Sequence, residues 1–320
     1  MKLDELLRNI RFLFLDFDQT VAQTFFHMPG AKNDMVTEAY EMALGMIWGN
    51  DSFELLEGVR GLQNRAPGEL IRAILENEEK MGDSEGRLYL IKTAKQKFAD
   101  VYLSGKKLND ILASCVPAGK GISWEWDDEN PERIITEFLV RAKLNHLLQK
   151  IGPYWPLPCP GFPQFYRKLP VLEQKHGVKI VLGVISSGHE IFIKKTFSCW
   201  GIECPASLLT DDDLRGSDID LAKAAKPNPI LLDMLYKIWL KNQGLVLTDD
   251  QFLAFKEEAR AKTVYFGDDP NKDGQFARNA GVKFGHHDPK FDPDLQNSQP
   301  SAEKIIFYDW RQVSGLLGMD

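Results

Sequence analysis

The chain has 320 residues, of which 43% are hydrophobic and 27% are charged, a composition typical of globular proteins that fold around a buried core. A formal net charge of −7 with no basic block argues against a general nucleic-acid-binding protein. The first residues lack the apolar stretch of a signal peptide, and no segment is long enough to span a bilayer. We therefore expect a cytoplasmic protein with neither nucleic acid nor a membrane as its partner.

The first predicted element is a short buried strand that ends in two carboxylates. Residues 12–15 read Phe-Leu-Phe-Leu, and Asp16 and Asp18 follow at once. Side chains two residues apart near a strand end project to the same side, so Asp16 and Asp18 would lie together at the carboxyl edge of a sheet. Two carboxylates that close repel unless they share a cation, which suits a Mg²⁺ site. An acidic loop that caps the strand is the alternative.

A long block with helical periodicity comes next, from about residue 34 to residue 148. Its apolar residues recur at spacings of three and four, which predicts helices at 35–46, 67–80, 86–103 and 131–148. The block ends at the proline-dense residues 152–161, which cannot continue a helix and predict a stiff connector.

Beyond the connector, predicted strands and helices alternate. Strands are predicted at 178–185, 207–210, 263–266, 282–284 and 305–308, and helices at 163–174, 190–200, from 229, 249–261 and from 275. This alternation is typical of a Rossmann-like α/β fold with a doubly wound, mainly parallel sheet. The helical block is then an insertion, so we expect an α/β core domain of residues 1–21 and 158–320 and an enlarged helical cap domain of residues 22–157.

Three further polar segments stand at predicted strand or helix boundaries, in the order Ser186-Ser187-Gly188, Lys226-Pro227-Asn228-Pro229 and Gly267-Asp268-Asp269-Pro270-Asn271-Lys272-Asp273. Together with Asp16-Phe17-Asp18-Gln19-Thr20 they resemble the four motifs of the haloacid dehalogenase-like (HAD) hydrolase superfamily. The resemblance is to its helical-cap branch, which includes phosphoglycolate phosphatase and β-phosphoglucomutase. It covers residues 1–21 and 158–290 of the core. Each motif is weak alone, but four in this order are highly specific.

The resemblance implies a role for each of these residues in phosphate-ester hydrolysis. This reaction needs a nucleophile, a proton donor and positive charge around the phosphoryl oxygens. Asp16 would attack phosphorus to form an aspartyl-phosphate, and Asp18 would protonate the leaving oxygen and later deprotonate water. Phosphate would be bound by Ser186, Ser187, Gly188 and Lys226.

The same resemblance implies Mg²⁺ as the cofactor, since the acids offer hard oxygen ligands. Asp16, the backbone carbonyl of Asp18 and the Asp268 carboxylate would hold the ion. Asp269 and Asp273 would be ligands or would support the ligands, and the sequence leaves their relative roles open.

The chain departs from the common family pattern in several respects, one of which is an extra helical segment near residues 249–261. Gln19 stands where the family usually has glycine, which predicts a reshaped turn after the nucleophile. The insertion is larger than many helical caps, and its residues 57–65 resemble the family's substrate-specificity loop. We expect Arg60 or Arg65 to contact a second anionic group of the substrate, with ordinary solvated arginines as the alternative. The His286-His287-Asp288 segment is predicted to be a loop.

The function that the resemblance implies is hydrolysis of a small phosphorylated metabolite by a Mg²⁺-dependent phosphatase. A phosphomutase shares all of these core residues and stays open as an alternative. Hydrolytic dehalogenation is less favoured, because Asp18 supplies an acid that alkoxide departure needs and halide departure does not. A silent protein-binding scaffold is disfavoured by the intact acids Asp16, Asp18 and Asp268.

Overall fold

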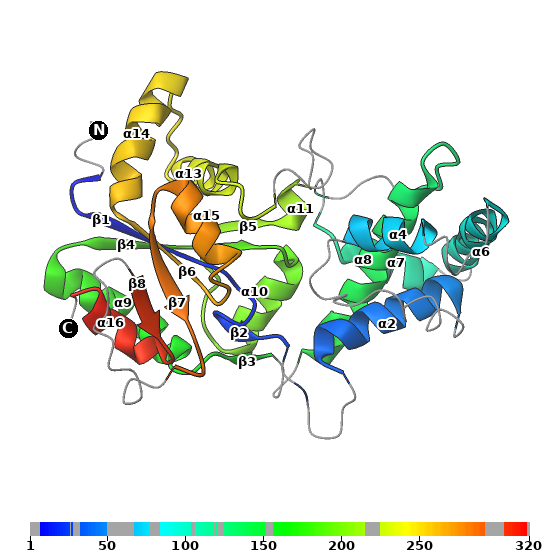
Figure 1. Ribbon diagram of the computed structural model, residues 1–320, viewed down its shortest axis with the longest axis horizontal. Helices are drawn as coiled ribbons and strands as arrows, with labels where there is room; N and C mark the ends of the chain where they lie inside the picture. The colour runs from blue at the N-terminus through cyan, green and yellow to red at the C-terminus, as the bar shows by residue number, and fades with distance from the viewer. Residues whose placement is uncertain are drawn as a thin grey trace. The chain divides into compact units, whose positions relative to one another are not determined.

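The computed structural model describes residues 7–25, 27, 33–49, 67–76, 84–103, 106–117, 120, 124–151, 156–214, 225–291 and 304–318. The chain divides into two compact units, one of residues 1–23 and 156–320 and the other of residues 24–155. The first unit contains an α/β sheet, and the elements of the second are helices (Figure 1). None of the helices in the described residues is both long enough and apolar enough to cross a membrane.

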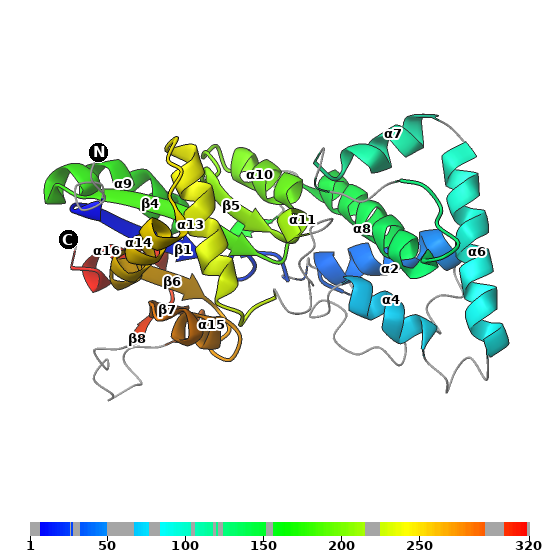
Figure 2. The same cartoon turned by 90° about the horizontal axis from the view of Figure 1, so that it is seen from above.

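The sheet of the first unit has six strands in the order β5-β4-β1-β6-β7-β8, and every neighbouring pair is parallel (Figure 2). The strands are β1 (Ile10–Leu15), β4 (Lys179–Ser186), β5 (Ser207–Thr210), β6 (Thr263–Gly267), β7 (Lys283–His287) and β8 (Lys304–Phe307). Parallel neighbours need crossover connections, and helices lie in the chain between β4, β5, β6 and β7, so the predicted doubly wound α/β fold is confirmed. β1 lies at the centre and is flanked by strands from beyond the insertion.

Helices cover both faces of this sheet because successive side chains of a strand point to opposite sides. On one face lie α13 (Ile230–Asn242), α14 (Asp249–Ala261) and α15 (Asp273–Ala280), and on the other α9 (Phe162–His176), η2 (Trp310–Gln312) and α16 (Val313–Leu316) (Figure 1). Tyr265 packs on Phe276 of α15, with ring centroids 4.7 Å apart. Its neighbour Phe266 packs on Trp310, at 5.2 Å.

The first unit also contains short elements that the sequence pattern does not predict. The strands β2 (Ala22–Gln23) and β3 (Leu157–Pro158) form an antiparallel pair where the chain leaves and re-enters this unit. Two further helices of the described part of this unit are α10 (Glu190–Cys199), which was predicted, and α11 (Asp211–Leu214), which was not.

The helical unit has its own core. Within the residues that the structure describes, its helices are α2 (Met35–Trp48), α4 (Pro67–Leu75), α6 (Ser84–Leu103), α7 (Lys106–Ser114) and α8 (Pro131–Lys150). Leu44, Ile71 and Phe138 are buried in this core, one from each of α2, α4 and α8. The unit therefore buries apolar surface independently of the sheet.

Candidate active site

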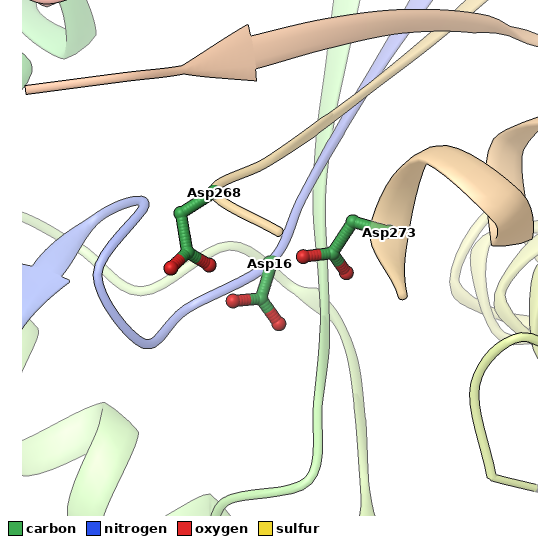
Figure 3. A group of neighbouring side chains, drawn as sticks. All are labelled: Asp16, Asp268 and Asp273. Carbon is green, nitrogen blue, oxygen red and sulfur yellow. The ribbon is translucent and has the colours of Figure 1, made fainter. Parts of the chain in front are cut away.

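Three carboxylates from separate segments meet at the carboxyl end of the central strands. Asp16 follows β1, Asp268 follows β6, and Asp273 begins α15. One oxygen of each lies within 4.8 Å of the others. Figure 3 shows Asp268 and Asp273 on either side of Asp16. This is the edge at which open α/β sheets place ligands.

Backbone contacts bring these segments together. The Asp16 N–H donates to the Phe266 carbonyl at 2.8 Å, which continues the pairing of β1 with β6 up to the acids. Gly267 then leaves room for the third acid, since a Cβ on Gly267 would lie 2.4 Å from the Cβ of Asp273. The absence of a side chain at Gly267 thus permits the Asp273 carboxylate to reach the strand ends.

Lys226 places a buried positive charge among these acids. Its ammonium donates to Asp16 Oδ1, and to Asp273 Oδ1 at 3.0 Å, and its side chain is only 4% exposed. The Tyr265 hydroxyl also donates to Asp273 Oδ1, at 3.1 Å. A carboxylate that accepts from both an ammonium and a phenol is fixed in orientation, so Asp273 holds Lys226 against Asp16.

The electrostatic balance of the site favours a further cation. Burial raises the pKa of Asp16 well above its ordinary value, against the opposing effect of Lys226. Burial and the neighbouring Asp273 raise the pKa of Asp268 to about 7. Burial alone would lower the pKa of Lys226, but Asp16 and Asp273 raise it well above its usual range. One ammonium is shared among three clustered acids, so the oxygen donors fit a hard divalent ion such as Mg²⁺.

The predicted phosphate-binding loop lies at the end of β4, the neighbour of β1. The Ser186 hydroxyl is buried and accepts a 2.9 Å hydrogen bond from the Gly188 N–H. Ser187, between them, is exposed. The structure therefore places Ser186 and Gly188 in one tight turn at the same sheet edge as Asp16.

The two remaining core acids occupy different positions. Asp18 lies close enough to raise the pKa values of Asp16 and Asp268 by charge repulsion. The Asp269 carboxylate instead accepts from the backbone N–H groups of Asn271, at 2.8 Å, and Lys272, at 3.2 Å. Asp269 thus stabilises the turn before α15, and Asp273 is the acid that joins Asp16 and Asp268. The predicted substrate residues Arg60 and Arg65 lie outside the described residues.

Some residues at the site were not singled out in the sequence. Tyr265 was interpreted only as part of a strand, although its hydroxyl is a polar group between the apolar residues Val264 and Phe266. His286 and His287 were predicted to be in a loop, but they are the last two residues of β7. That prediction was wrong because the strand was expected to end at Phe284, whereas it pairs with β6 and β8 up to His286 and His287.

No protein-family model matches the chain, and no curated protein sequence matches it. Solved structures match it at low identity. A 2-haloacid dehalogenase from Pseudomonas syringae pv. Tomato DC3000 is 16% identical, with a TM-score of 0.44 and coverage of 97% of this chain and 98% of that chain. An HAD phosphatase from Thermococcus onnurineus is 15% identical, with a TM-score of 0.39 and coverage of 97% and 99%. A putative HAD-hydrolase from Bacillus subtilis, solved bound to magnesium, is 13% identical, with a TM-score of 0.36 and coverage of 96% and 98%.

Proposed function

We propose that the protein is a HAD-type phosphatase that hydrolyses a small phosphorylated metabolite with the aid of Mg²⁺. The observation that carries the proposal is the buried contact of Lys226 with Asp16 and Asp273, beside Asp268. These residues come from motifs up to 257 positions apart (273 − 16), yet they meet at one sheet edge. A chance acidic turn would not bring the motifs together in this way.

In the proposed reaction, a carboxylate oxygen of Asp16 attacks phosphorus, and the bond from phosphorus to the alcohol oxygen breaks. Asp18 donates its proton to that departing oxygen. Asp18 then takes a proton from water, whose oxygen attacks the phosphorus of the aspartyl-phosphate, so that inorganic phosphate leaves and Asp16 is regenerated.

The remaining groups of the site would bind the negatively charged phosphoryl group. The Lys226 ammonium and the Ser186 hydroxyl would donate to phosphoryl oxygens, and Asp273 would keep Lys226 in place. Mg²⁺, held by Asp16, Asp268 and the backbone carbonyl of Asp18, would neutralise negative charge on the phosphoryl group. We assign the helical unit the role of the cap that selects the organic part of the substrate.

The test is a panel of phosphorylated sugars, organic acids and nucleotides, assayed for released phosphate with Mg²⁺ and with EDTA. We expect hydrolysis of at least one ester with Mg²⁺ and none with EDTA. Isomerised sugar phosphate that depends on a bisphosphate would indicate a mutase instead. Halide release from 2-haloacids, without phosphate release, would contradict the proposal.

The nucleophile is tested with ³²P-labelled substrate in a rapid acid quench. We expect label on the wild-type protein that hydroxylamine removes, as it does from acyl phosphates, and none on Asp16→Asn. Asp250→Asn, an exposed residue in the first turn of α14, is the matched control and should keep both label and turnover.

A further inference from the structure

Two adjacent histidines of β7 contact the two loops that carry the acids. His286 Nε2 lies 3.1 Å from the backbone carbonyl of Asp268, and His287 Nδ1 lies 2.8 Å from the backbone carbonyl of Gln19. A carbonyl oxygen can only accept, so each of these ring nitrogens must carry the hydrogen and donate it. Each imidazole thus engages the main chain of one acidic loop.

His286 and His287 reach different loops because successive side chains of a strand point to opposite faces of the sheet. The His286 ring lies stacked on Phe284, two residues earlier, with ring centroids 5.9 Å apart. The Phe284 ring lies against Gly274 of α15, since a Cβ on Gly274 would be 3.3 Å from it. Phe284 and His286 therefore lie on the face of the sheet that α15 covers. The His287 ring lies 5.3 Å from Phe307, which packs on Trp310 on the opposite face.

The loop that His287 contacts has an unusual backbone. Gln19 has a φ of 57°, in the left-handed region that residues with a side chain rarely adopt. Its N–H donates to the Ala22 carbonyl at 2.7 Å, and its carbonyl accepts from His287 and from Cys159 Sγ at 3.4 Å. Trp310 Nε1 donates to the next carbonyl, of Thr20, at 2.8 Å. The turn directly after Asp18 is therefore held by donors from distant segments.

We propose that His286 and His287 are positioning residues for two different parts of the reaction. His286 fixes the main chain of Asp268, and with it a metal ligand. His287, which is 2% exposed, fixes the turn that aims the Asp18 carboxylate at the leaving oxygen. This inference rests on the proposed phosphatase function and adds residues that the four motifs do not include.

The test uses substitutions that keep or lose one ring nitrogen. The amide nitrogen of Asn falls where His Nδ1 lies, and that of Gln falls where Nε2 lies. His287→Asn should therefore retain the bond to Gln19, and His287→Gln should lose it. For His286 the order is reversed, so His286→Gln retains the bond to Asp268 and His286→Asn loses it. Each site thus provides its own control.

For His286 the readout is metal binding. We expect His286→Asn to raise the Mg²⁺ concentration for half-maximal activity, and the dissociation constant of Mn²⁺ in calorimetry, by about tenfold or more. His286→Gln should stay near the wild-type values. Equal Mn²⁺ affinity in all three proteins would overturn the role of His286, and this binding measurement needs no turnover.

For His287 the readout is the dependence on the leaving group. His287→Gln should lower kcat about 100-fold for an alkyl phosphate, whose alkoxide needs a proton, and far less for p-nitrophenyl phosphate. KM and Mg²⁺ dependence should not change, and His287→Asn should restore the alkyl phosphate rate. An equal loss for both esters, or equal behaviour of both variants, would overturn the role of His287.

A separate measurement covers the case in which no phosphate ester is hydrolysed, where the proposed function itself fails. Amide hydrogen exchange of the peptide containing residues 17–22 should then be faster in His287→Gln than in the wild type or His287→Asn. Unchanged exchange would overturn the positioning role, whatever the activity of the protein.

Discussion

Lys226 is the residue whose role depends most on folding, since its ammonium joins carboxylates that lie 210 and 47 positions away in the chain. Removing one partner of a buried ion pair leaves the other charges buried and uncompensated. Lys226→Met should therefore reduce the free energy of unfolding of the metal-free protein by about 3 kcal/mol at pH 8.5, measured by urea titration. At pH 5, where protons can neutralise Asp16 and Asp268, the reduction should be smaller.

The control for this substitution is Lys194→Met. Lys194 pairs with Glu190 four residues earlier on α10, but its side chain is 57% exposed. An exposed pair of this kind contributes about 0.5 kcal/mol or less, so the control should change stability little at either pH. A loss for Lys226→Met that is the same at pH 5 and pH 8.5 would contradict the proposed charge balance.

The raised pKa values of Asp16 and Asp268 predict a pH-dependent response to metal. Between their ordinary values near 4 and their raised values, the folded protein binds protons that the unfolded chain has released. Stability without metal must therefore decrease as the pH rises through this range. A divalent ion displaces these protons, so Mg²⁺ should raise the melting temperature more at pH 8 than at pH 6.

Calorimetry in buffers with different ionisation enthalpies measures directly how many protons Asp16 and Asp268 release when Mg²⁺ binds. Mg²⁺ binding near pH 6 should release protons into the buffer, and the number released should fall in Asp268→Asn. Binding without proton release near pH 6 would mean that the acids are already ionised in the metal-free protein.

At the scale of elements, the end of β6 depends on the absence of a side chain at Gly267. A methyl group there would overlap with Asp273, so Gly267→Ala must displace either the strand end or the first turn of α15. We expect at least a tenfold loss of kcat and a stability loss of about 1–3 kcal/mol, as for other overpacked sites.

Gly45 in the interior of α2 offers the opposite case, because among the described residues a Cβ there has no atom within 4 Å apart from its own helix backbone. Alanine favours a helix over glycine, so Gly45→Ala should stabilise the protein by about 0.5–1 kcal/mol without altering kcat. Urea titrations should show a lower free energy of unfolding for Gly267→Ala than for the wild type, and a higher one for Gly45→Ala. Stabilisation by Gly267→Ala would show that Asp273 does not pack against this strand end.

The elements also show what the sequence can and cannot predict. Long periodic segments were predicted closely, such as 131–148 against Pro131–Lys150, and 207–210 is the observed β5. The two-residue strands β2 and β3 were missed, because pairing between Ala22 and Pro158 leaves no periodic signal. The strand β7 was predicted too short because His286 and His287 are polar, and their bonds to distant carbonyls cannot be inferred from neighbours in the chain.

The same limit applies within the site. The motif spacing indicated which acids to consider, and parallel strand ends predicted that they would meet. The motif spacing could not show which of Asp269 and Asp273 joins the acidic cluster. That choice depends on the turn before α15, where backbone N–H groups donate to the Asp269 carboxylate. Nor could it indicate Tyr265, whose partner depends on the face of β6 that packs against α15.

At the scale of the whole molecule, the separate cores of the two units predict separate responses to ligand. By their positions in the chain, Trp48, Trp124, Trp126 and Trp155 report on the helical unit, and Trp200, Trp239 and Trp310 report on the sheet unit. Mg²⁺ at 100 times its dissociation constant should stabilise the unit that binds it by about 2.7 kcal/mol. We therefore expect urea unfolding in two steps, of which Mg²⁺ shifts only one.

The steps are assigned with Trp→Phe variants, one unit at a time, and fluorescence detection. The step that Mg²⁺ shifts should disappear when Trp200, Trp239 and Trp310 are replaced, and should remain when Trp48, Trp124, Trp126 and Trp155 are replaced. A single transition in which both sets of tryptophans respond to Mg²⁺ would show that the units unfold together.

The central place of β1 in the sheet has a consequence for synthesis. A ribosome delivers this strand first, but β4 and β6, which flank it, emerge only after more than 160 further residues (179 − 15). During that interval the Phe-Leu-Phe-Leu segment has no strand beside it, while the helical unit can already collapse around its own core. The nascent chain therefore carries this apolar segment unpaired until β4 has been synthesised, and an unpaired apolar strand of this kind is prone to aggregate.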